Sequence, residues 1–142
     1  MRIRELGIEE YDAIIGVWRE SGLSHRPRGR DSRSEIKRQM ELKPNLFLGA
    51  FEGSELIGVV IGTDDTRKGW INRLAVRPDH QRKGVGSALL REIEGRLRAR
   101  GNRIIGVLIE APNEASEKFF GKMGYEPYGF IVYLSKRDSE EI

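Results

Sequence analysis

The residues best suited to chemistry form one short stretch, Gln81-Arg82-Lys83-Gly84-Val85-Gly86. Its glycines allow a ligand to approach the backbone closely, and the helical pattern that begins at Gly84 offers N–H groups that have no partner inside the helix. A helix N-terminus also carries partial positive charge, which favours phosphate. Arg82 and Lys83 add full charges that suit a diphosphate. The stretch predicts a phosphate-binding loop, with a tight strand-to-helix turn as the alternative.

Other phosphate-binding and metal-binding patterns are absent from the sequence. A dinucleotide GxGxxG would require glycine at position 89, where Leu89 stands, and GxxxxGK[ST] occurs nowhere. Hydride transfer and NTP hydrolysis are therefore not favoured. The chain has no cysteine, and His25 and His80 are its only histidines, which excludes a thiolate zinc site and an HExxH motif. The sequence predicts no metal site.

The elements that must position the loop alternate between strand and helix patterns. Apolar residues recur at helical spacing at Val85, Leu89 and Ile93, whereas Pro78 ends the strand-like run before the loop. The order predicts an α/β fold of the α+β type, a mixed sheet with helices on both faces. Strands are expected at 2–6, 46–51, 56–62, 70–76, 103–109, 125–128 and 130–134, and helices at 9–20, 32–42, 84–100 and 113–123.

Composition places the chain among ordinary globular domains. With 142 residues, 38% of them hydrophobic and 33% charged, residues 1–142 are expected to form a single domain. The longest apolar run, 56–61, is far shorter than the ~20 residues that a membrane helix needs, and the N-terminus has no signal-peptide pattern. No membrane association is expected, and the predicted location is cytoplasmic.

Positive charge is concentrated in residues 25–38. This segment holds six basic and two acidic residues, whereas the whole chain has a net charge of +3. A solvated surface is the simple interpretation, and an acidic peptide or another anionic acceptor is the alternative.

Three motifs together resemble a known family, the Gcn5-related N-acetyltransferases (GNAT). Gln81 to Gly86 resembles its (Gln/Arg)-x-x-Gly-x-(Gly/Ala) signature for acetyl-CoA, and Leu74-Ala75-Val76 is similar to its cofactor strand. Asn113 followed by residues 119–125 resembles its Asn…(Leu/Phe)-Tyr-x-x-x-Gly-Phe segment. The resemblance covers essentially the whole chain and extends to small bacterial and archaeal members similar to ribosomal-protein N-acetyltransferases. It implies a GNAT-like fold, a central and mostly antiparallel sheet with one splayed parallel strand pair and helices on both faces.

The resemblance also implies roles for individual residues. Backbone N–H groups of the loop would hold the diphosphate of acetyl-CoA, and the strand at Leu74 would pair with the pantetheine arm. A main-chain N–H near Leu74 or Ala75 would polarise the thioester carbonyl, an effect worth ~3 kcal/mol in other enzymes. Asn113 would bind the arm. The implied cofactor-binding residues are Leu74, Ala75, Val76, Gln81, Arg82, Lys83, Gly84, Val85, Gly86, Ser87, Asn113, Ser116, Phe119 and Phe120.

The sequence departs from the family at two catalytic positions. Phe120 stands where many members carry a tyrosine proposed to protonate the leaving thiolate, and Trp70 stands where histone-acetylating members place a glutamate base. The remaining candidates are Glu110 as the base, with an exposed loop carboxylate as the simpler interpretation, and Tyr125 as the acid. Tyr128 and Tyr133 are further candidates for the acid.

The resemblance implies direct acetyl transfer from acetyl-CoA to a primary amine, either a protein N-terminal α-amine or a small amine. A catalytically weak acyl-CoA-binding sensor or assembly module is the alternative. A nucleic-acid binder, suggested by the sequence pI of about 9.3, is disfavoured because no stacking platform or binding motif is present. A homodimer is common among relatives, and the final strands are the expected contact surface.

Overall fold

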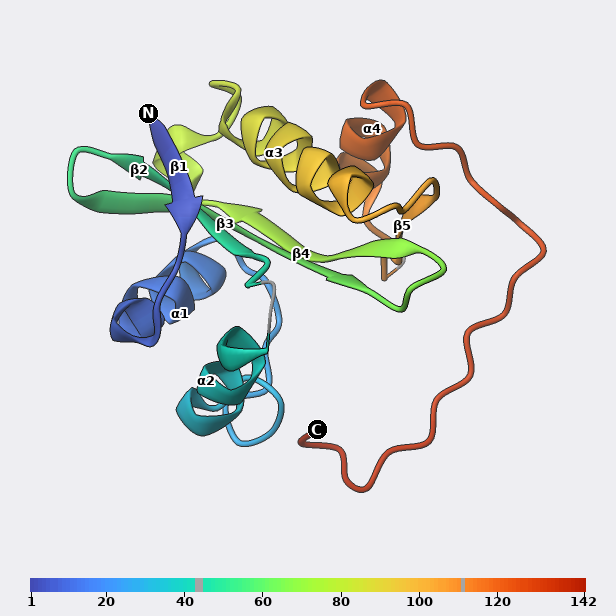
Figure 1. Ribbon diagram of the computed structural model, residues 1–142, viewed down its shortest axis with the longest axis horizontal. Coiled ribbons are helices and arrows are strands. Elements are labelled where there is room, and N and C mark those ends of the chain that lie inside the picture. The colour runs from blue at the N-terminus through green and yellow to red at the C-terminus, as the bar shows by residue number, and fades with distance from the viewer. Residues whose placement is uncertain (43–44, 111) are drawn as a thin grey trace.

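A computed structural model describes residues 1–42, 45–110 and 112–142. Within these residues a five-stranded sheet, in the order β1-β2-β3-β4-β5, carries helices on both faces (Figure 1). The predicted fold class is therefore confirmed. The elements are β1 (Arg2–Glu5), α1 (Tyr11–Glu20), α2 (Arg33–Glu41), β2 (Phe47–Glu52), β3 (Glu55–Asp64), β4 (Gly69–Val76), α3 (Val85–Ala99), β5 (Ile105–Val107) and α4 (Glu114–Lys122), with short 3-10 turns at Ile8–Glu10 and Pro78–His80.

The sheet is antiparallel from β1 to β4, and only β4 and β5 run parallel. The parallel pairing begins at Gly69 and Ile105 and ends at Ile71 and Val107. β4 continues to Val76. The second half of β4 therefore separates from β5, as expected for a splayed strand pair.

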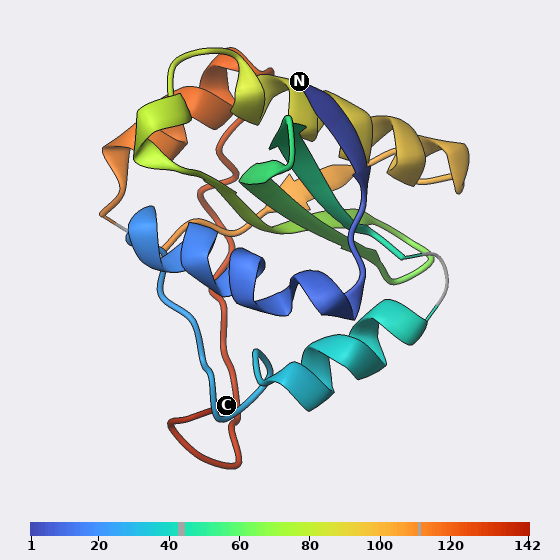
Figure 2. The same cartoon turned by 90° about the vertical axis from the view of Figure 1, so that its left-hand side faces the viewer.

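Two apolar clusters lie on opposite faces of the sheet. α1 and α2 pack on one face around the fully buried Trp18, and α3 packs on the other through Leu89, Ile93 and Leu97 (Figure 2). A Cβ atom added at Gly62 of β3 would lie 2.8 Å from the Ile93 side chain. The glycine thus lets α3 sit close against the sheet.

A β-bulge at Asn72 changes which way the residues of β4 face. Ile61 of β3 pairs with Arg73 while Gly62 pairs with Ile71, so Asn72 has no partner of its own. Ile71 consequently faces the α3 cluster, and Arg73 stacks on Trp18 in the α1 cluster, with its guanidinium carbon 4.6 Å from the indole ring. Side chains of a regular strand spaced two apart would share one face.

The predicted helix starts are confirmed by their caps. Ser32 Oγ accepts a hydrogen bond from the backbone N–H of Glu35 at 3.3 Å, and Asn113 Oδ1 accepts one from the N–H of Ser116 at 3.2 Å. Each side chain satisfies one of the N–H groups that a helix leaves without an internal partner.

The final strands predicted at 125–128 and 130–134 are wrong. After α4 the structure has no regular helix or strand in its described residues, and residues 126–142, here called the C-terminal segment, run in an extended arc away from the sheet (Figure 1). A strand needs a hydrogen-bonded neighbour, and none lies beside this segment among the described residues. The strand expected at 103–109 is likewise shortened to Ile105–Val107. No described helix has the length and apolar content to span a membrane.

Asp64 at the end of β3 joins the sheet to the end of α3, and this contact makes stability depend on pH. Hydrogen bonds from Arg100 at 2.6 Å and Asn102 at 2.9 Å lower the pKa of Asp64 from 3.8 to about 2. Because the folded-state pKa lies below the unfolded value, this stabilisation is present above pH 4 and is lost as the pH falls towards 2. We expect Asp64→Asn to lower the urea midpoint at pH 7, with the difference from wild type disappearing near pH 2. An equal difference at both pH values would contradict this account.

Candidate functional site

The predicted phosphate-binding loop connects β4 to α3. The Gln81 side-chain amide donates a hydrogen bond to the Val76 carbonyl at 2.9 Å, which ties the loop to the end of β4. Arg82 and Gly84 have positive φ values of 62° and 86° and turn the chain into α3. Among the described residues no side chain caps α3 at Gly84, so its first N–H groups are available to a ligand.

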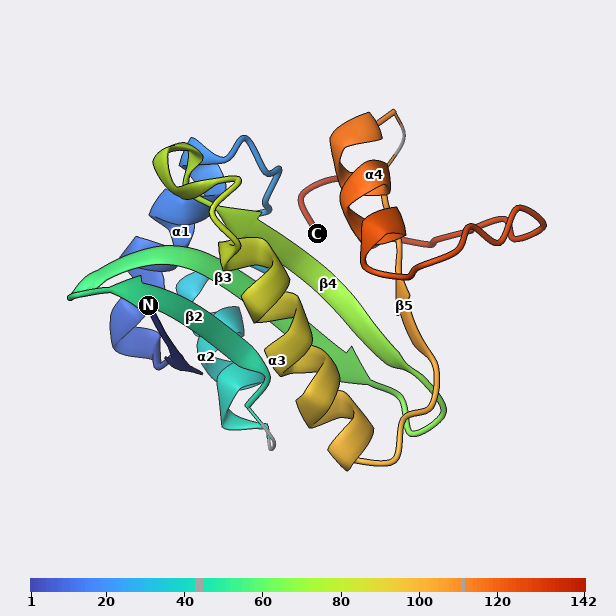
Figure 3. The same cartoon turned by 90° about the horizontal axis from the view of Figure 1, so that it is seen from above.

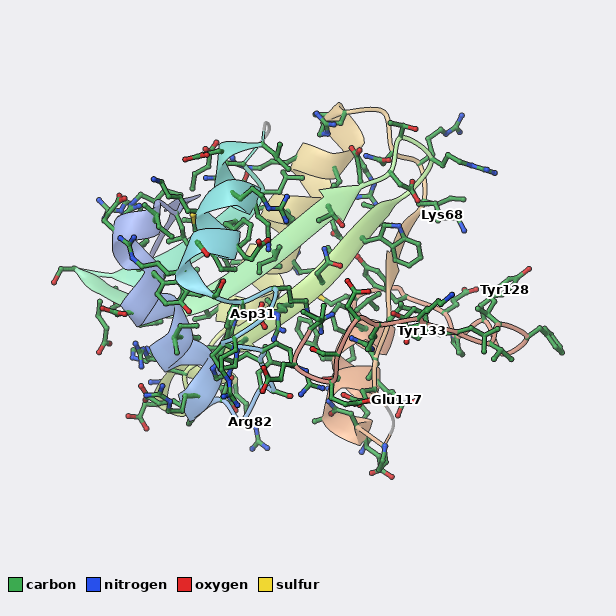
Figure 4. All side chains as sticks on the ribbon, turned by 90° about the horizontal axis from the view of Figure 1, so that it is seen from below. Asp31, Lys68, Arg82, Glu117, Tyr128 and Tyr133 are labelled. Carbon is green, nitrogen blue, oxygen red and sulfur yellow. The ribbon has the colours of Figure 1, made fainter. Side chains whose placement is uncertain are left out.

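The surroundings of the loop suit an anionic ligand. In the part of the chain that the structure describes, nothing lies within 4 Å of a Cβ atom placed at Gly84, so the backbone there is open to close approach. Arg82 and Lys83 are exposed, and the Arg82 side chain extends from the edge of the molecule (Figure 4). Open N–H groups, a helix N-terminus and two exposed cations fit a diphosphate.

Gly86 brings together three elements that are distant in sequence. A Cβ atom at Gly86 would lie 3.5 Å from the ring of Phe119 on α4 and 3.8 Å from Val76 Cγ2 on β4. The end of β4, the start of α3 and α4 therefore meet at this residue. The structure thus places Val76, Gly86 and Phe119, all predicted cofactor-binding residues, next to one another.

The separation of β4 from β5 exposes the backbone of β4 where the cofactor strand was predicted. Leu74, Ala75 and Val76 all follow the last residue of β4 that pairs with β5, Ile71. Their opposite edge remains paired with β3, at Val60, Val59 and Gly58. The Val76 carbonyl accepts from Gln81, and the other backbone groups on the β5 side of these residues pair with no described strand, which leaves them open to an extended chain that contains amides.

α4 lies beside the start of α3 at Gly86. Phe119 is half-buried and Phe120 is buried, and their rings meet edge to face with centroids 5.1 Å apart. Ser116 is half-buried on the first turn, and Asn113 is exposed and caps the helix. Phe120 belongs to the apolar cluster under α3, so its side chain serves packing. Its ring has no hydroxyl group and cannot donate a proton.

The two catalytic candidates lie in different surroundings. The Tyr125 hydroxyl donates a hydrogen bond to Glu94 on α3 at 2.6 Å. Burial, and then this contact with a carboxylate, raise the pKa of Tyr125 above its ordinary value of 10. Acting as an acid would require the hydroxyl to leave Glu94. Glu110 is exposed beyond the end of β5.

The loop between α1 and α2 is fastened to β4 by a buried ion pair that sequence reasoning missed. Arg73 Nη2 lies 2.8 Å from Asp31 Oδ2, and both side chains are almost fully buried. Arg73 Nη1 also donates to the Ser24 carbonyl, and the backbone N–H of Arg26 donates to Asp31 Oδ2 at 2.6 Å. Burial lowers the pKa of Arg73, and the Asp31 carboxylate opposes this change. The basic segment is therefore held beside the separated half of β4.

Comparison with known proteins agrees with this geometry. The model of the acetyltransferase (GNAT) family matches residues 11–125. An acetyltransferase of Pectobacterium atrosepticum is 33% identical over 141 residues, 99% of this chain and 98% of that protein.

Solved structures give the same result. The crystal structure of the PaiA N-acetyltransferase of Thermoplasma acidophilum in complex with coenzyme A superimposes with a TM-score of 0.79 at 27% identity, over 88% of this chain and 89% of that one. A ribosomal-protein-alanine N-acetyltransferase of Brucella melitensis shares the fold with a TM-score of 0.71 at 17% identity, over 96% and 100% of the two chains. The protein is therefore a member of the acetyltransferase (GNAT) family, an acyltransferase whose cosubstrate is acetyl-CoA.

Proposed function

We propose that this protein transfers the acetyl group of acetyl-CoA directly to a primary amine, either the α-amine of a protein N-terminus or a small amine. The observation that carries the proposal is the meeting of β4, α3 and α4 at Gly86, next to the half of β4 that has left β5. This arrangement would offer a diphosphate the helix start and an extended arm the strand backbone, in one continuous path.

In the proposed reaction the amine nitrogen attacks the thioester carbonyl carbon. An N–C bond forms, the C–S bond breaks and the thiolate leaves. N–H groups at the start of α3 would hold the diphosphate, and a backbone N–H near Leu74 or Ala75 would stabilise the negative charge on the carbonyl oxygen. The proton released by the amine passes to a base, for which Glu110 is the candidate.

The residues at the site favour an amine that is already partly neutral. An α-amine with a pKa of ~7.7–8.0 is neutral far more often at pH 7.4 than a lysine side chain with a pKa of ~10.4. By the resemblance to the family, Trp70 stands where histone-acetylating members place a glutamate base. Glu110 is exposed, which leaves its carboxylate in water. An acceptor of low pKa makes the smallest demand on such a base.

A pair of matched peptides tests the proposal. One has a free α-amine and acetylated lysines, and the other has a blocked N-terminus and free lysines. We expect release of CoA thiol, and a mass gain of one acetyl group, with the first peptide. Equal rates with both peptides at pH 7.4 would contradict the α-amine preference. Saturable acetyl-CoA binding without turnover on any amine would favour the acyl-CoA sensor, which is supported by Phe120 and Trp70.

Glu110→Gln and Tyr125→Phe test the two catalytic candidates separately. If Glu110 is the base, Glu110→Gln should lower kcat by about 100-fold, in the range usual for general bases, without changing acetyl-CoA affinity. Tyr125→Phe removes the hydrogen bond to Glu94 and should lower stability. Unchanged kcat in Tyr125→Phe would give Tyr125 a structural role only, whereas unchanged kcat in Glu110→Gln would exclude Glu110 as the base.

A further inference from the structure

Exposed arginines gather in the loop between α1 and α2. Residues 24–33 are here called the basic loop, and its exposed arginines are Arg26, Arg28, Arg30 and Arg33. The loop has one acidic residue, Asp31, whose buried carboxylate is already paired with Arg73. Among the residues that the structure describes, Arg26, Arg30 and Arg33 form no ion pair. The loop therefore presents positive charge that the rest of the protein does not neutralise.

Backbone hydrogen bonds hold the basic loop in one shape. The N–H groups of Gly29 and Asp31 both donate to the Arg26 carbonyl at 3.0 Å, and the Arg30 carbonyl accepts from the Gln39 side chain at 2.8 Å. None of these bonds uses an arginine side chain. A loop that is already ordered loses less conformational entropy when it binds a partner.

The basic loop lies beside the half of β4 that has left β5. Arg73, which holds the loop, immediately precedes Leu74, where the proposed function places the thioester carbonyl. Burial lowers the pKa of Arg73, and the nearby charges of Arg30 and Arg26 lower it further, so both cations lie close to this strand. An extended peptide advances about 3.3–3.6 Å per residue. A peptide whose amine reaches the carbonyl would thus bring its next few residues to the loop.

The structure already places an acidic chain against this loop. Residues 138–142, here called the acidic tail, hold three acidic residues and lie beside the basic loop (Figures 2 and 3). Arg28 Nη2 lies 3.0 Å from Glu141 Oε1. A Cβ atom at Gly29 would lie 2.9 Å from the Cα atom of Ile142, so the backbone of the tail packs directly on this glycine. The basic loop therefore fits an acidic peptide in shape as well as in charge.

A peptide fits the basic loop better than a nucleic acid does. Proteins that bind single-stranded nucleic acids combine positive charge with aromatic side chains on which the bases stack. Residues 24–33 contain no Phe, Tyr or Trp. The loop offers charge alone, which suits the carboxylates of a peptide.

We propose that the basic loop selects an acceptor peptide whose reacting amine is followed, within about four residues, by carboxylate side chains. The acidic tail occupies the loop until such a peptide displaces it. This inference rests on the proposed acetyl transfer and adds to it the acceptor class, an acidic N-terminal peptide. Exposed ion pairs are individually weak, so the loop gives selectivity rather than tight binding.

A peptide that is already acetylated tests the loop without any transfer. A fluorescent peptide with an acetylated N-terminus and Asp or Glu at positions 2–4 is titrated with the protein in the presence of CoA, and anisotropy gives its Kd. The same peptide with Asn or Gln at these positions should bind about 10-fold more weakly, as expected for the loss of two exposed ion pairs. Arg26→Gln with Arg30→Gln should weaken binding of the acidic peptide by the same factor.

A matched variant controls for net charge. Arg91→Gln with Arg98→Gln removes two charges from exposed positions of α3 and should leave binding of the acidic peptide unchanged. Equal binding of the acidic and amide peptides, or an equal loss in the two double variants, would overturn the proposal. Tighter binding of a single-stranded oligonucleotide of the same charge would overturn it in favour of a nucleic-acid surface.

The acidic tail has a test of its own. Replacing its three acidic residues together, with Asp138→Asn, Glu140→Gln and Glu141→Gln, should tighten binding of the acidic peptide about 3-fold, because the loop loses its internal occupant. Binding of the amide peptide should not change. Unchanged affinity for the acidic peptide would show that the tail and the peptide do not share the loop, which would overturn this part of the proposal.

Turnover separates a failure of this inference from a failure of the proposed function. With free α-amines, kcat/KM should be about 10-fold higher for the acidic peptide than for the amide peptide, mainly through KM. Equal kcat/KM values would overturn the acidic selectivity and leave acetyl transfer intact. Absence of transfer to either peptide would overturn the proposed function, and the acceptor role of the loop with it.

Discussion

Gly86→Glu is expected to weaken acetyl-CoA binding by about 100-fold. The new carboxylate side chain would project from the start of α3, where β4, α3 and α4 meet. Its Cβ atom would lie 3.5 Å from the Phe119 ring. At an effective dielectric constant of ~20, a carboxylate about 5 Å from one phosphate charge costs about 3 kcal/mol. Isothermal titration with acetyl-CoA measures the loss.

Two variants control for backbone and charge effects. Gly86→Ala adds only a methyl group at an ordinary contact distance and should bind acetyl-CoA nearly as well as wild type. Gly95→Glu places the same carboxylate on the exposed face of α3, where nothing lies within 4 Å of a Cβ atom, and should leave binding unchanged. If Gly86→Glu bound acetyl-CoA with wild-type affinity, this loop would not belong to the cosubstrate site and would serve only as a turn.

Asp31→Asn is expected to produce the largest loss of stability. Asp31 is 3% exposed and pairs with Arg73 at 2.8 Å. Removing one partner of a buried pair leaves the other charge buried without compensation, which costs about 3–5 kcal/mol. The midpoint of urea denaturation at pH 7 measures the change, and circular dichroism verifies that the variant still folds.

An exposed ion pair provides the matched comparison. Glu35→Gln removes the partner of Arg38 in α2, where the two side chains are 42% and 61% exposed. This change should cost less than about 1 kcal/mol, because water screens exposed charges. Replacing both buried partners, with Asp31→Asn and Arg73→Met, should recover part of the loss. If Asp31→Asn retained the wild-type urea midpoint, the buried pair would contribute nothing to stability.

Local sequence patterns predicted the parts of the fold that are decided locally. The helix starts at Ser32 and Asn113 and the glycine turn into α3 depend on residues within three or four positions of one another. The positions of the first five strands along the chain also followed from apolar runs separated by turns. These features need little information from distant parts of the chain.

Features that depend on distant contacts could not be predicted in this way. Arg73 and Asp31 are 42 positions apart, and Asp31 stands among arginines as though it were only a surface charge. The bulge at Asn72 leaves no apolar signature, because it is a mismatch in register between two strands. The apolar run at 130–134 predicts a strand, but whether such a run forms one depends on a neighbouring strand that the sequence does not specify.

The bulge at Asn72 decides where β4 can change its length. Arg73 reaches Asp31, and Leu74 faces α3, because the pairing with β3 passes over Asn72 and treats Ile71 and Arg73 as consecutive. Deletion of Asn72 would leave a regular ladder with the same partners and the same faces, whereas deletion of one residue within 74–76 would turn the side chains that follow to the opposite face of the sheet. A one-residue deletion should therefore be tolerated at Asn72, as in the exposed 65–68 turn, and be eliminated by selection within 74–76 during divergence of this lineage.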